Sequence, residues 1–194
     1  AQINLLIGEA MDRVSVIIPN YNGKHFLAPC LEALSRQSMK EFETIVVDNG
    51  SSDGSVDFLK DKYPKVRRIE FSENTGFCKA VNAGVKAAET EYVLLLNNDT
   101  IPDESFVEEL LKAIVSKPDA FACGSCMLTA DDHGILDGAG DLYNALGWAF
   151  ARGKGKRADD FNKEKKVFAV CAGAAIYRKE LFAELGYLDE KHFA

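Results

Sequence analysis

The sequence lacks three features that would assign it to specialised classes of protein. No apolar run in its 194 residues approaches the roughly 18 residues that suggest a membrane-spanning helix. The first ten residues, AQINLLIGEA, lack the basic start and long apolar core of a signal peptide. A basic excess is also missing, because the net charge is -7, which argues against a nucleic-acid partner. We therefore expect a cytoplasmic globular protein.

A cysteine pattern typical of a disulfide framework is missing as well. The five cysteines are odd in number and scattered, which favours reduced thiols. Cys123 and Cys126 form a C-x-x-C within AFACGSCML, a spacing that suits a redox pair or half of a zinc site. No second Cys or His pair stands at a matching distance, and the stretch has the character of a buried strand. We therefore favour a structural role for the pair.

Four short apolar runs predict the strands of one sheet, at 14–19, 43–48, 66–71 and 92–97. Apolar residues recur with helical spacing between and after them, at 27–34, 56–59, 77–85 and 106–114. This alternation predicts an α/β fold, with a parallel sheet and helices on both faces. We expect an N-terminal extension over 1–12 and one domain over 13–194. Within the domain, an irregular excursion over 129–166 precedes a further strand and a short helix.

Polar loops follow all four expected strands and read PNYNG, DNGSSDGS, SENTG and NNDT. Open parallel sheets bind ligands in the crevice beyond the carboxyl ends of their strands. Each loop alone is weak evidence, because Gly, Asn, Asp and Ser also serve turns and helix caps. The coincidence of four such loops favours a site for a nucleotide or a phosphate.

The excursion contains a basic stretch, RGKGKRADDFNKEKK, with seven Lys or Arg against three acids. The favoured interpretation is a solvated loop. The alternative is a flap that meets a diphosphate or an anionic acceptor.

Five motifs, in their order and spacing, resemble the family 2 glycosyltransferases. They are VSVIIPNYNG, IVVDNGSSDGS, ENTGFCKAVNAGV, LLLNNDT and CAGAAIYRKELFAELGYLDEKHF. The resemblance covers residues 13–194. It implies the GT-A fold of nucleotide-diphospho-sugar transferases, a mostly parallel twisted sheet flanked by helices.

By this resemblance, Pro19 and Tyr21 line the nucleobase pocket, where an aromatic ring offers a flat apolar contact. The alternative for Tyr21 is an aromatic that packs the loop. Asp48 matches the family position that accepts a hydrogen bond from the pyrimidine N–H, which favours uracil or thymine over cytosine. Its alternative role, as a helix cap, suits Ser52 or Asp53 better.

The loop SENTG and the helix after it lie beside the nucleotide in the family. The resemblance makes Asn74, Gly76 and Lys79 candidates for contacts with ribose and phosphate. Gly76 would let the backbone approach closely, and a helix N-terminus favours anionic oxygens. Solvated surface is an equal alternative for Lys79. Asn82 is expected to fix the loop by hydrogen bonding.

NNDT matches the family's Asp-x-Asp element with the first acid replaced by Asn97. The resemblance implies that Asp99 holds a divalent metal, Mg²⁺ or Mn²⁺, against the diphosphate. Asn97 and Asn98 would hydrogen-bond ribose or phosphate. Because the ligand supplies further oxygens, we expect weak metal affinity without nucleotide. The alternative is that Asp99 caps a helix that begins near Asp103, a role that Thr100 could also fill.

An inverting transfer needs a carboxylate that takes the proton of the acceptor hydroxyl. Family members carry this acid shortly after a segment like LDEKHF, and this chain ends at Ala194. Asp189 and Glu190 match the preceding DE and are interpreted as loop or acceptor-side residues. We therefore expect the catalytic base beyond Ala194, in a longer enzyme, and poor sugar transfer by this chain alone.

The resemblance implies an inverting glycosyltransferase of the hexosyltransferase type, with a UDP- or dTDP-sugar donor and a glycan or lipid-linked acceptor. The excursion and NNDT look most like bacterial rhamnosyltransferases of cell-surface polysaccharide, whose donor would be dTDP-rhamnose. Peripheral contact with the inner face of the membrane is one option. Two alternatives stay open. One is a nucleotide-sugar-binding module without catalysis. The other is a nucleotidyltransferase, although the sequence PNYNGKH after the first strand is a poor match to the Gly-rich signature of that class.

Overall fold

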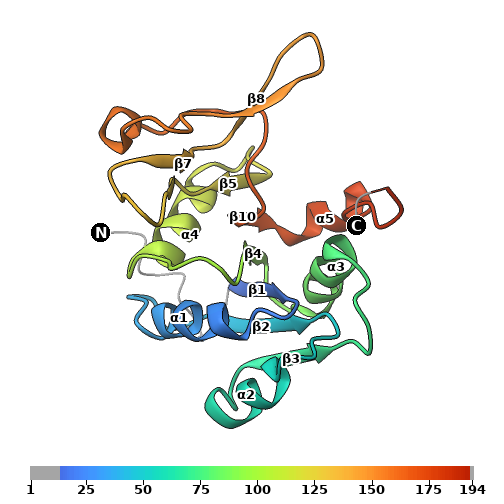
Figure 1. The fold of residues 1–194 in the computed structure, drawn as a ribbon. Helices are drawn as coiled ribbons and strands as arrows, with labels where there is room; N and C mark the ends of the chain where they lie inside the picture. Colours follow the sequence, from blue (N-terminus) through green and yellow to red (C-terminus); the bar gives the residue numbers. More distant parts are fainter. Residues whose placement is uncertain (1–13, 193–194) are drawn as a thin grey trace, which may run out of the picture.

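A computed structural model describes residues 14–192, so the predicted extension over 1–12 lies outside the described residues. Its centre is a six-stranded sheet with the order β3-β2-β1-β4-β10-β5 (Figure 1). The strands are β1 (Val14–Asn20), β2 (Glu43–Asp48), β3 (Arg67–Glu70), β4 (Tyr92–Leu96), β5 (Ala122–Gly124) and β10 (Ala174–Arg178). The four strands predicted from apolar runs are thus confirmed as β1 to β4.

Strand directions place a topological switch point at the centre of the sheet. β1 pairs in parallel with both β2 and β4, and β2 pairs in parallel with β3. β10 runs antiparallel to β4 and β5. The predicted α/β fold with a mostly parallel sheet is confirmed. Because β2 and β4 lie on opposite sides of β1, the connections after β1 and β4 diverge and leave a crevice at the carboxyl ends of these strands.

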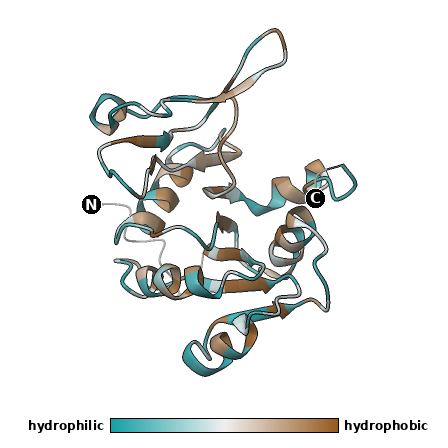
Figure 2. Ribbon diagram, viewed as in Figure 1, coloured by the Kyte–Doolittle hydropathy of each residue, from teal (hydrophilic) through white to brown (hydrophobic). Residues whose placement is uncertain are grey.

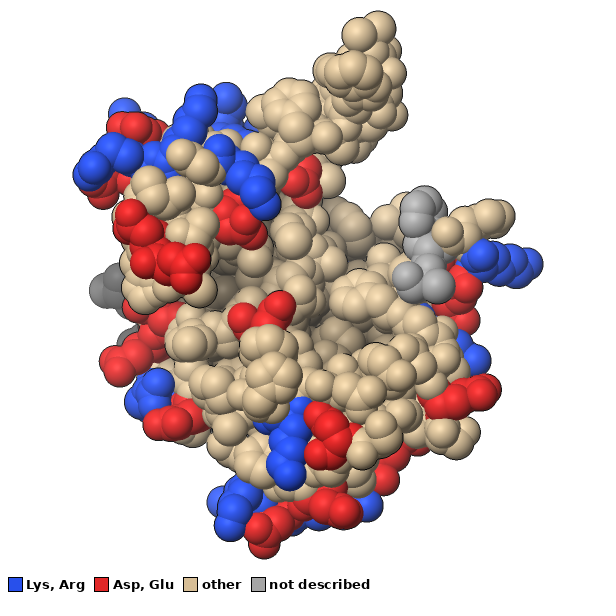
Figure 3. Space-filling view, in the orientation of Figure 1, with Lys and Arg blue, Asp and Glu red and all other residues tan. Residues whose placement is uncertain are grey.

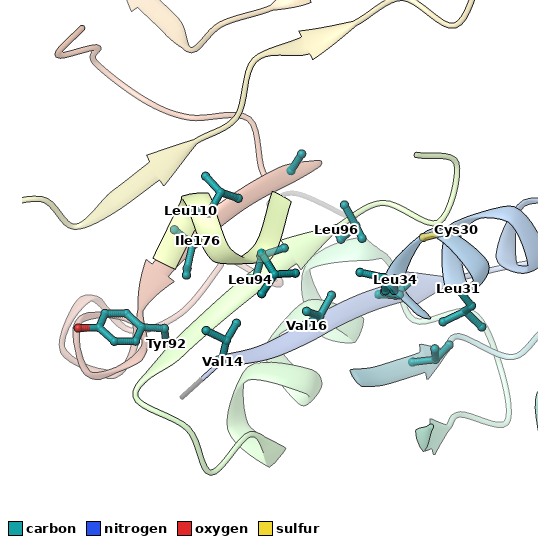
Figure 4. Packing of buried hydrophobic residues seen from close by; sticks show 14 of the residues in the cluster. Val14, Val16, Cys30, Leu31, Leu34, Tyr92, Leu94, Leu96, Leu110 and Ile176 are labelled. Carbon is teal, nitrogen blue, oxygen red and sulfur yellow. The ribbon is translucent and has the colours of Figure 1, made fainter. Parts of the chain in front are cut away.

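The helices cover both faces of the sheet. They are α1 (Lys24–Ser35), α2 (Ser55–Lys62), α3 (Phe77–Ala87), α4 (Phe106–Ser116) and α5 (Lys179–Leu185). One buried cluster joins α1 and α4 to the sheet and includes Val16, Leu94 and Ile176 (Figure 4). A second cluster on the other face contains Ile17 and Leu95. Successive residues of β1 and β4 therefore pack into opposite clusters, so both faces of these strands are buried. Figure 2 shows the apolar colour along the central strands.

The excursion between β5 and β10 folds into two small sheets. Residues 129–166 contain β7 (Leu136–Gly138), β8 (Asp141–Tyr143), β9 (Ala149–Ala151) and the 3-10 helix η2 (Ala158–Phe161), and β6 (Met127–Leu128) precedes them. β6 pairs with β7 and β8 pairs with β9, apart from the main sheet. Figure 1 shows the β8–β9 hairpin, in orange, projecting away from the rest of the molecule.

The stretch AFACGSCML differs from its prediction as one buried strand. β5 and β6 belong to different sheets, and Leu128 is 44% exposed. The chain leaves the main sheet at Ser125, whose backbone N and Oγ donate to Ala174 O at 3.1 and 2.9 Å. All five cysteines of the chain are free thiols in the structure.

The start of α4 also differs from the prediction. The helix begins at Phe106 rather than near Asp103. The Asp103 carboxylate accepts the backbone N–H of Ser105 at 3.0 Å and thereby forms a turn before the helix.

Within residues 14–192, no helix has both the length and the apolar character needed to cross a membrane.

Candidate functional site

The carboxyl ends of β1 and β4 open into a pocket of about 390 Å³, which we call the switch-point pocket. All four predicted polar loops contribute to it. Its lining residues are Pro19, Asn20, Tyr21, Asn49, Asn74, Gly76, Phe77, Ala80, Asn97, Asn98 and Asp99. The structure therefore brings together every predicted site residue except Asp48 and Lys79. The sheet topology explains this gathering, because the switch point is where loops from both directions meet.

Hydrogen-bonded amides connect the strand ends beneath this pocket. Asn98 Nδ2 donates to Asn20 Oδ1 at 2.8 Å, and Asn20 Nδ2 donates to Asp48 Oδ1 at 2.9 Å. The second carboxylate oxygen, Asp48 Oδ2, accepts the backbone N–H of Ser51 at 2.9 Å. We call Asn98, Asn20 and Asp48 the amide row. Because an amide both donates and accepts, it can continue such a row where a carboxylate can only end it.

Because Gly23 has no side chain, the side chains of the amide row have room beside it. A Cβ at this position would lie 2.2 Å from Asn98 Nδ2 and 2.7 Å from Asn20 Oδ1. Any larger residue must therefore displace these side chains. The preceding Asn22 is left-handed, with φ of 51°, and its backbone N donates to Ser51 Oγ at 2.9 Å. The first loop is thus held by both its backbone shape and its side-chain contacts.

Asn49 holds the loop before α3 against the pocket. Its side chain is 4% exposed, and its Nδ2 donates to Asn74 Oδ1 at 2.9 Å and to Gly76 O at 3.1 Å. Its Oδ1 accepts the backbone N–H of Thr75 at 2.9 Å. Gly76 has φ of 89° and ψ of 160°, a conformation open essentially to glycine alone. This loop is therefore fixed in a shape that only its glycine permits.

The N-terminus of α3 faces the pocket without a side-chain cap. Gly76 is the N-cap residue, and it forms no side-chain capping hydrogen bond. Phe77 and Ala80, from the first turns of the helix, line the pocket. Free backbone N–H groups and the helix dipole favour an anion at such a position.

Asp99 is an exposed carboxylate that forms no hydrogen bond or ion pair with any residue of 14–192. It does not cap α4, which begins only at Phe106. Thr100 does not cap the helix either, because its Oγ1 donates to Asn97 O at 2.7 Å. The described residues contain no cluster of three or more His, Cys, Asp or Glu that could hold a metal. A hard cation at Asp99 would therefore need oxygens from a ligand, as an exposed single carboxylate beside amide oxygens allows.

Two predicted site residues lie away from the pocket lining. Asp48 is 1% exposed and lies in register with Asn20, which covers it. Lys79 is exposed on α3 and does not line the pocket, which fits its solvated alternative. Tyr21 lines the pocket and is 51% exposed, so its ring is accessible to a ligand.

Sequence reasoning missed Asn20, Asn49 and Gly23. Their signal was present, because each stands in a polar loop at a strand end, but amides and glycines there also serve ordinary turns. Cys30 lies close to the site, with its Sγ 3.9 Å from Asn97 O. Burial raises the pKa of Cys30 to about 12, so it stays a neutral thiol and packs as part of the core.

Asn82 fixes a loop by hydrogen bonding, as predicted, but the loop is the one after α5. Its Nδ2 donates to Leu188 O at 2.9 Å and to Glu190 Oε1 at 2.8 Å, and its Oδ1 accepts the backbone N–H of Leu188 at 3.0 Å. The neighbouring Asp189 closes its own turn by accepting the backbone N–H of Lys191 at 2.9 Å, a bond that lowers the pKa of Asp189. Neither acid lines the switch-point pocket.

A second pocket, of about 180 Å³, lies where the excursion meets β10. Ser125, Asp141, Cys171 and an ion pair between Lys154 Nζ and Asp137 Oδ1, 2.8 Å apart, are among its lining residues. It lies near the first pocket, because Ala174, which lines it, pairs with Leu96 at the end of β4, and the adjoining Gly173 O accepts the backbone N–H of Asn97 at 2.8 Å. The two pockets therefore border the same end of β4.

Solved structures share this arrangement of strands and helices. Residues 1–349 of S. aureus TarS superpose with a TM-score of 0.67 and 20% identity, over 94% of this chain and 52% of that one. Mannosyltransferase PcManGT from Pyrobaculum calidifontis, solved with GDP-Man and Mn2+, gives a TM-score of 0.64 at 20% identity, over 93% of this chain and 48% of that one. These likenesses confirm the GT-A fold.

Sequence comparison identifies the family. Glycosyltransferase GlyA of Streptococcus pneumoniae is 28% identical over 198 residues, covering 93% of this chain and 28% of that protein. Poly(ribitol-phosphate) beta-glucosyltransferase of Bacillus spizizenii is 38% identical over 93 residues, covering 45% of this chain and 15% of that protein. The chain thus spans less than a third of either relative. The model of the family described as Glycosyl transferase family 2 matches residues 15–186. The chain belongs to glycosyl transferase family 2.

Proposed function

We propose that this chain is the donor-binding part of an inverting glycosyltransferase that uses a UDP- or dTDP-sugar. The observation that carries the proposal is Asp99, an exposed carboxylate that forms no hydrogen bond or ion pair with the described residues, in a pocket whose other lining residues are uncharged. Relatives in the same fold support a nucleotide donor, since TarS has been solved with UDP and with UDP-GlcNAc.

The nucleobase contacts Pro19 and Tyr21 at the open side of the switch-point pocket. In this proposal, the Asp48 carboxylate accepts a hydrogen bond from the N–H of the pyrimidine ring. Each of its oxygens accepts one protein hydrogen bond, and a carboxylate oxygen can accept two, so both retain a free lone pair. Uracil and thymine carry the N–H that such an acceptor needs. Access to this buried carboxylate requires a small movement of Asn20, which covers it.

The diphosphate lies between the N-terminus of α3 and Asp99. Gly76 and the uncapped first turn of α3 offer backbone N–H groups to anionic oxygens, and Asn74 and Asn97 offer amide donors. Asp99 would hold Mg²⁺ or Mn²⁺, which neutralises the diphosphate leaving group when it is bound. Because Asp99 is the only acid that lines the pocket among the described residues, a cation should bind weakly before the nucleotide arrives.

The proton of the acceptor hydroxyl needs a carboxylate other than Asp99. Asp189 and Glu190 are engaged in the loop after α5, by Lys191 and Asn82. As the family resemblance implies, we propose that the catalytic base lies outside residues 14–192, and we expect this chain to bind donor but to transfer sugar slowly. The second pocket, at the same end of β4, is a candidate for the acceptor side.

The acceptor that we propose is a cell-surface polymer or its lipid-linked precursor. The name of the similar poly(ribitol-phosphate) beta-glucosyltransferase supports this class. The resemblance of the excursion and NNDT to bacterial rhamnosyltransferases supports dTDP-rhamnose as donor, and the UDP-GlcNAc complex of TarS supports a UDP-sugar equally.

Melting shifts test the proposal. UDP and dTDP with Mn²⁺ should raise the melting temperature, because a ligand at about 100 times its Kd adds about 2.7 kcal/mol to stability. CDP should give a smaller shift, since its ring lacks the N–H that Asp48 would accept. The absence of a shift with every diphosphate would contradict the proposal. Release of pyrophosphate from a nucleoside triphosphate and a sugar phosphate would favour a nucleotidyltransferase instead.

A further inference from the structure

The β8–β9 hairpin and the residue beside it carry an exposed apolar surface, which we call the hairpin surface. Its members are Tyr143, Leu146, Trp148, Phe150 and Phe168, with exposed fractions of 53%, 81%, 70%, 51% and 71%. The sequence from 142 to 151, LYNALGWAFA, contains no charged side chain. Figure 3 shows this part of the molecule as an uncharged knob that projects from the body.

The tip of the hairpin is an ordered turn. Asn144 Oδ1 accepts the backbone N–H groups of Leu146 and Trp148 at 3.0 and 3.1 Å, and Asn144 N donates to Trp148 O at 3.0 Å. Next to the turn, the rings of Tyr143 and Phe168 stack with centroids 4.9 Å apart. The turn therefore holds large apolar side chains in water in a defined arrangement. Large apolar side chains exposed on both faces of one projecting hairpin mark a place of interaction.

A basic surface lies next to the hairpin surface. Lys156, Lys163, Lys165 and Lys166 are exposed and form no ion pair with any described residue. Figure 3 shows a group of Lys and Arg, with some Asp and Glu among them, at the same end of the molecule as the uncharged knob. Residues 152–166 carry seven Lys or Arg against three acids, whereas the whole chain carries a net charge of -7, so this stretch is basic against the overall balance. Its partner should therefore be anionic.

We propose that the hairpin seats the protein on the surface of an anionic lipid bilayer. Leu146 and Trp148 enter the headgroup region, and the four lysines contact anionic headgroups. A projecting tip needs no complementary pocket on a fluid interface, whereas a protein partner would need a groove to receive it. Trp and Tyr are enriched at membrane interfaces, and lysines near an anionic bilayer strengthen the attraction. The proposal does not depend on nucleotide binding, but it would bring the switch-point pocket to a lipid-linked acceptor.

Vesicle binding tests this proposal directly. The chain should sediment with vesicles of phosphatidylcholine mixed with phosphatidylglycerol and much less with phosphatidylcholine alone. Trp148 is the only tryptophan of the chain, so intrinsic fluorescence reports on the hairpin tip itself. Its emission should shift to shorter wavelength when anionic vesicles are added, because the ring leaves water.

Two variants separate the apolar and the electrostatic contributions. The double change Leu146→Ser and Trp148→Ser should weaken vesicle binding by about tenfold or more, because buried apolar area is lost. The triple change Lys163→Gln, Lys165→Gln and Lys166→Gln should also weaken it by about tenfold or more. The tip hydrogen bonds use backbone groups of residues 146 and 148, so circular dichroism and melting should stay unchanged.

Matched controls change the same chemistry elsewhere. Val115→Ser with Leu185→Ser removes two side chains that are 45% and 69% exposed on α4 and α5. A second control, the triple change of Lys60, Lys62 and Lys65 to Gln, removes three charges near α2, far from the hairpin in Figure 1. Both controls should bind anionic vesicles like the parent chain.

Three results would overturn the proposal. They are the absence of sedimentation with anionic vesicles, equal loss in the hairpin variant and its control, and vesicle binding that leaves Trp148 emission unchanged. A blue shift that grows with protein concentration without lipid, together with a doubled mass, would instead assign the hairpin surface to self-association.

Discussion

At the residue scale, two neighbours at the end of β4 have opposite situations. Asn98 is held in the amide row by Asn20, whereas Asp99 has no hydrogen-bonding partner among residues 14–192. The difference follows from chemistry, because an amide can donate to Asn20 Oδ1 and an ionised carboxylate cannot. The strand end therefore offers one fixed amide and one acid that is available to a ligand.

Gly23→Ala tests whether the amide row shapes the pocket. The added Cβ would lie 2.2 Å from Asn98 Nδ2, so we expect the bond from Asn98 to Asn20 to break. Stability should fall by about 1–3 kcal/mol, as for other overpacked sites, and UDP affinity should fall with it. Chemical denaturation and calorimetric titration measure the two effects.

The control for this variant is Gly138→Ala, whose Cβ would meet only Ala151 Cβ, at 3.7 Å. It should leave UDP affinity unchanged. Parent-like stability and affinity in Gly23→Ala would contradict the proposed importance of the row.

The sequence was sufficient to single out Asp99 but not to find the burial of Asp48. Asp99 follows an apolar run within a recognisable motif, so local information identifies it. Asp48 is covered by Asn20, which is 28 positions earlier and lies opposite it in the register of β1 and β2. That register is a property of the assembled sheet, which no single loop encodes.

At the element scale, α3 connects the switch-point pocket to the last described segment of the chain. Its N-terminus lines the switch-point pocket, while Asn82, in its middle, is 1% exposed and binds Leu188 and Glu190. The helix thus fixes both a candidate ligand loop and the loop after α5.

Asn82→Ala should release the loop after α5. The change removes the partners of Leu188 N and Leu188 O, and unsatisfied polar groups of this kind cost about 1–3 kcal/mol. Hydrogen exchange should accelerate at the Leu188 amide and denaturation should show the loss of stability. Lys79→Ala, an exposed position on the same helix, is the control and should change neither. Unchanged exchange at Leu188 in the Asn82 variant would show that other contacts hold the loop.

Long periodic elements were predictable, and the short strands of the excursion were not. β1 to β4 and the helices after them have apolar repeats that their own residues reveal. β6 has only two residues and β7 to β9 have three each, so they are too short to show a period. The antiparallel direction of β10 likewise depends on how the whole excursion returns the chain to the sheet.

At the scale of the whole molecule, the switch-point pocket and the hairpin surface are separate. The pocket is built from loops at the carboxyl ends of β1 to β4, while the hairpin projects from the excursion (Figure 1). The match to glycosyl transferase family 2 covers both regions, over residues 15–186.

Because the two surfaces are separate, their variants should have independent effects. The Leu146→Ser, Trp148→Ser double variant should keep the parent affinity for UDP with Mn²⁺ while it loses vesicle binding. Asp99→Asn should keep vesicle binding while it loses nucleotide affinity. Calorimetry and vesicle sedimentation on both variants provide the comparison, and a joint loss in either variant would show that the surfaces are coupled.

The most direct test of the account is calorimetric titration of UDP into the chain with and without Mn²⁺, for the parent and for Asp99→Asn. Asp57→Asn, at an exposed carboxylate on α2, is the matched control. We predict that Mn²⁺ strengthens UDP binding to the parent and the control, and that Asp99→Asn binds UDP with Mn²⁺ about tenfold or more weakly, because an amide is a poorer ligand for a hard cation. Equal strengthening by Mn²⁺ in Asp99→Asn would contradict the account.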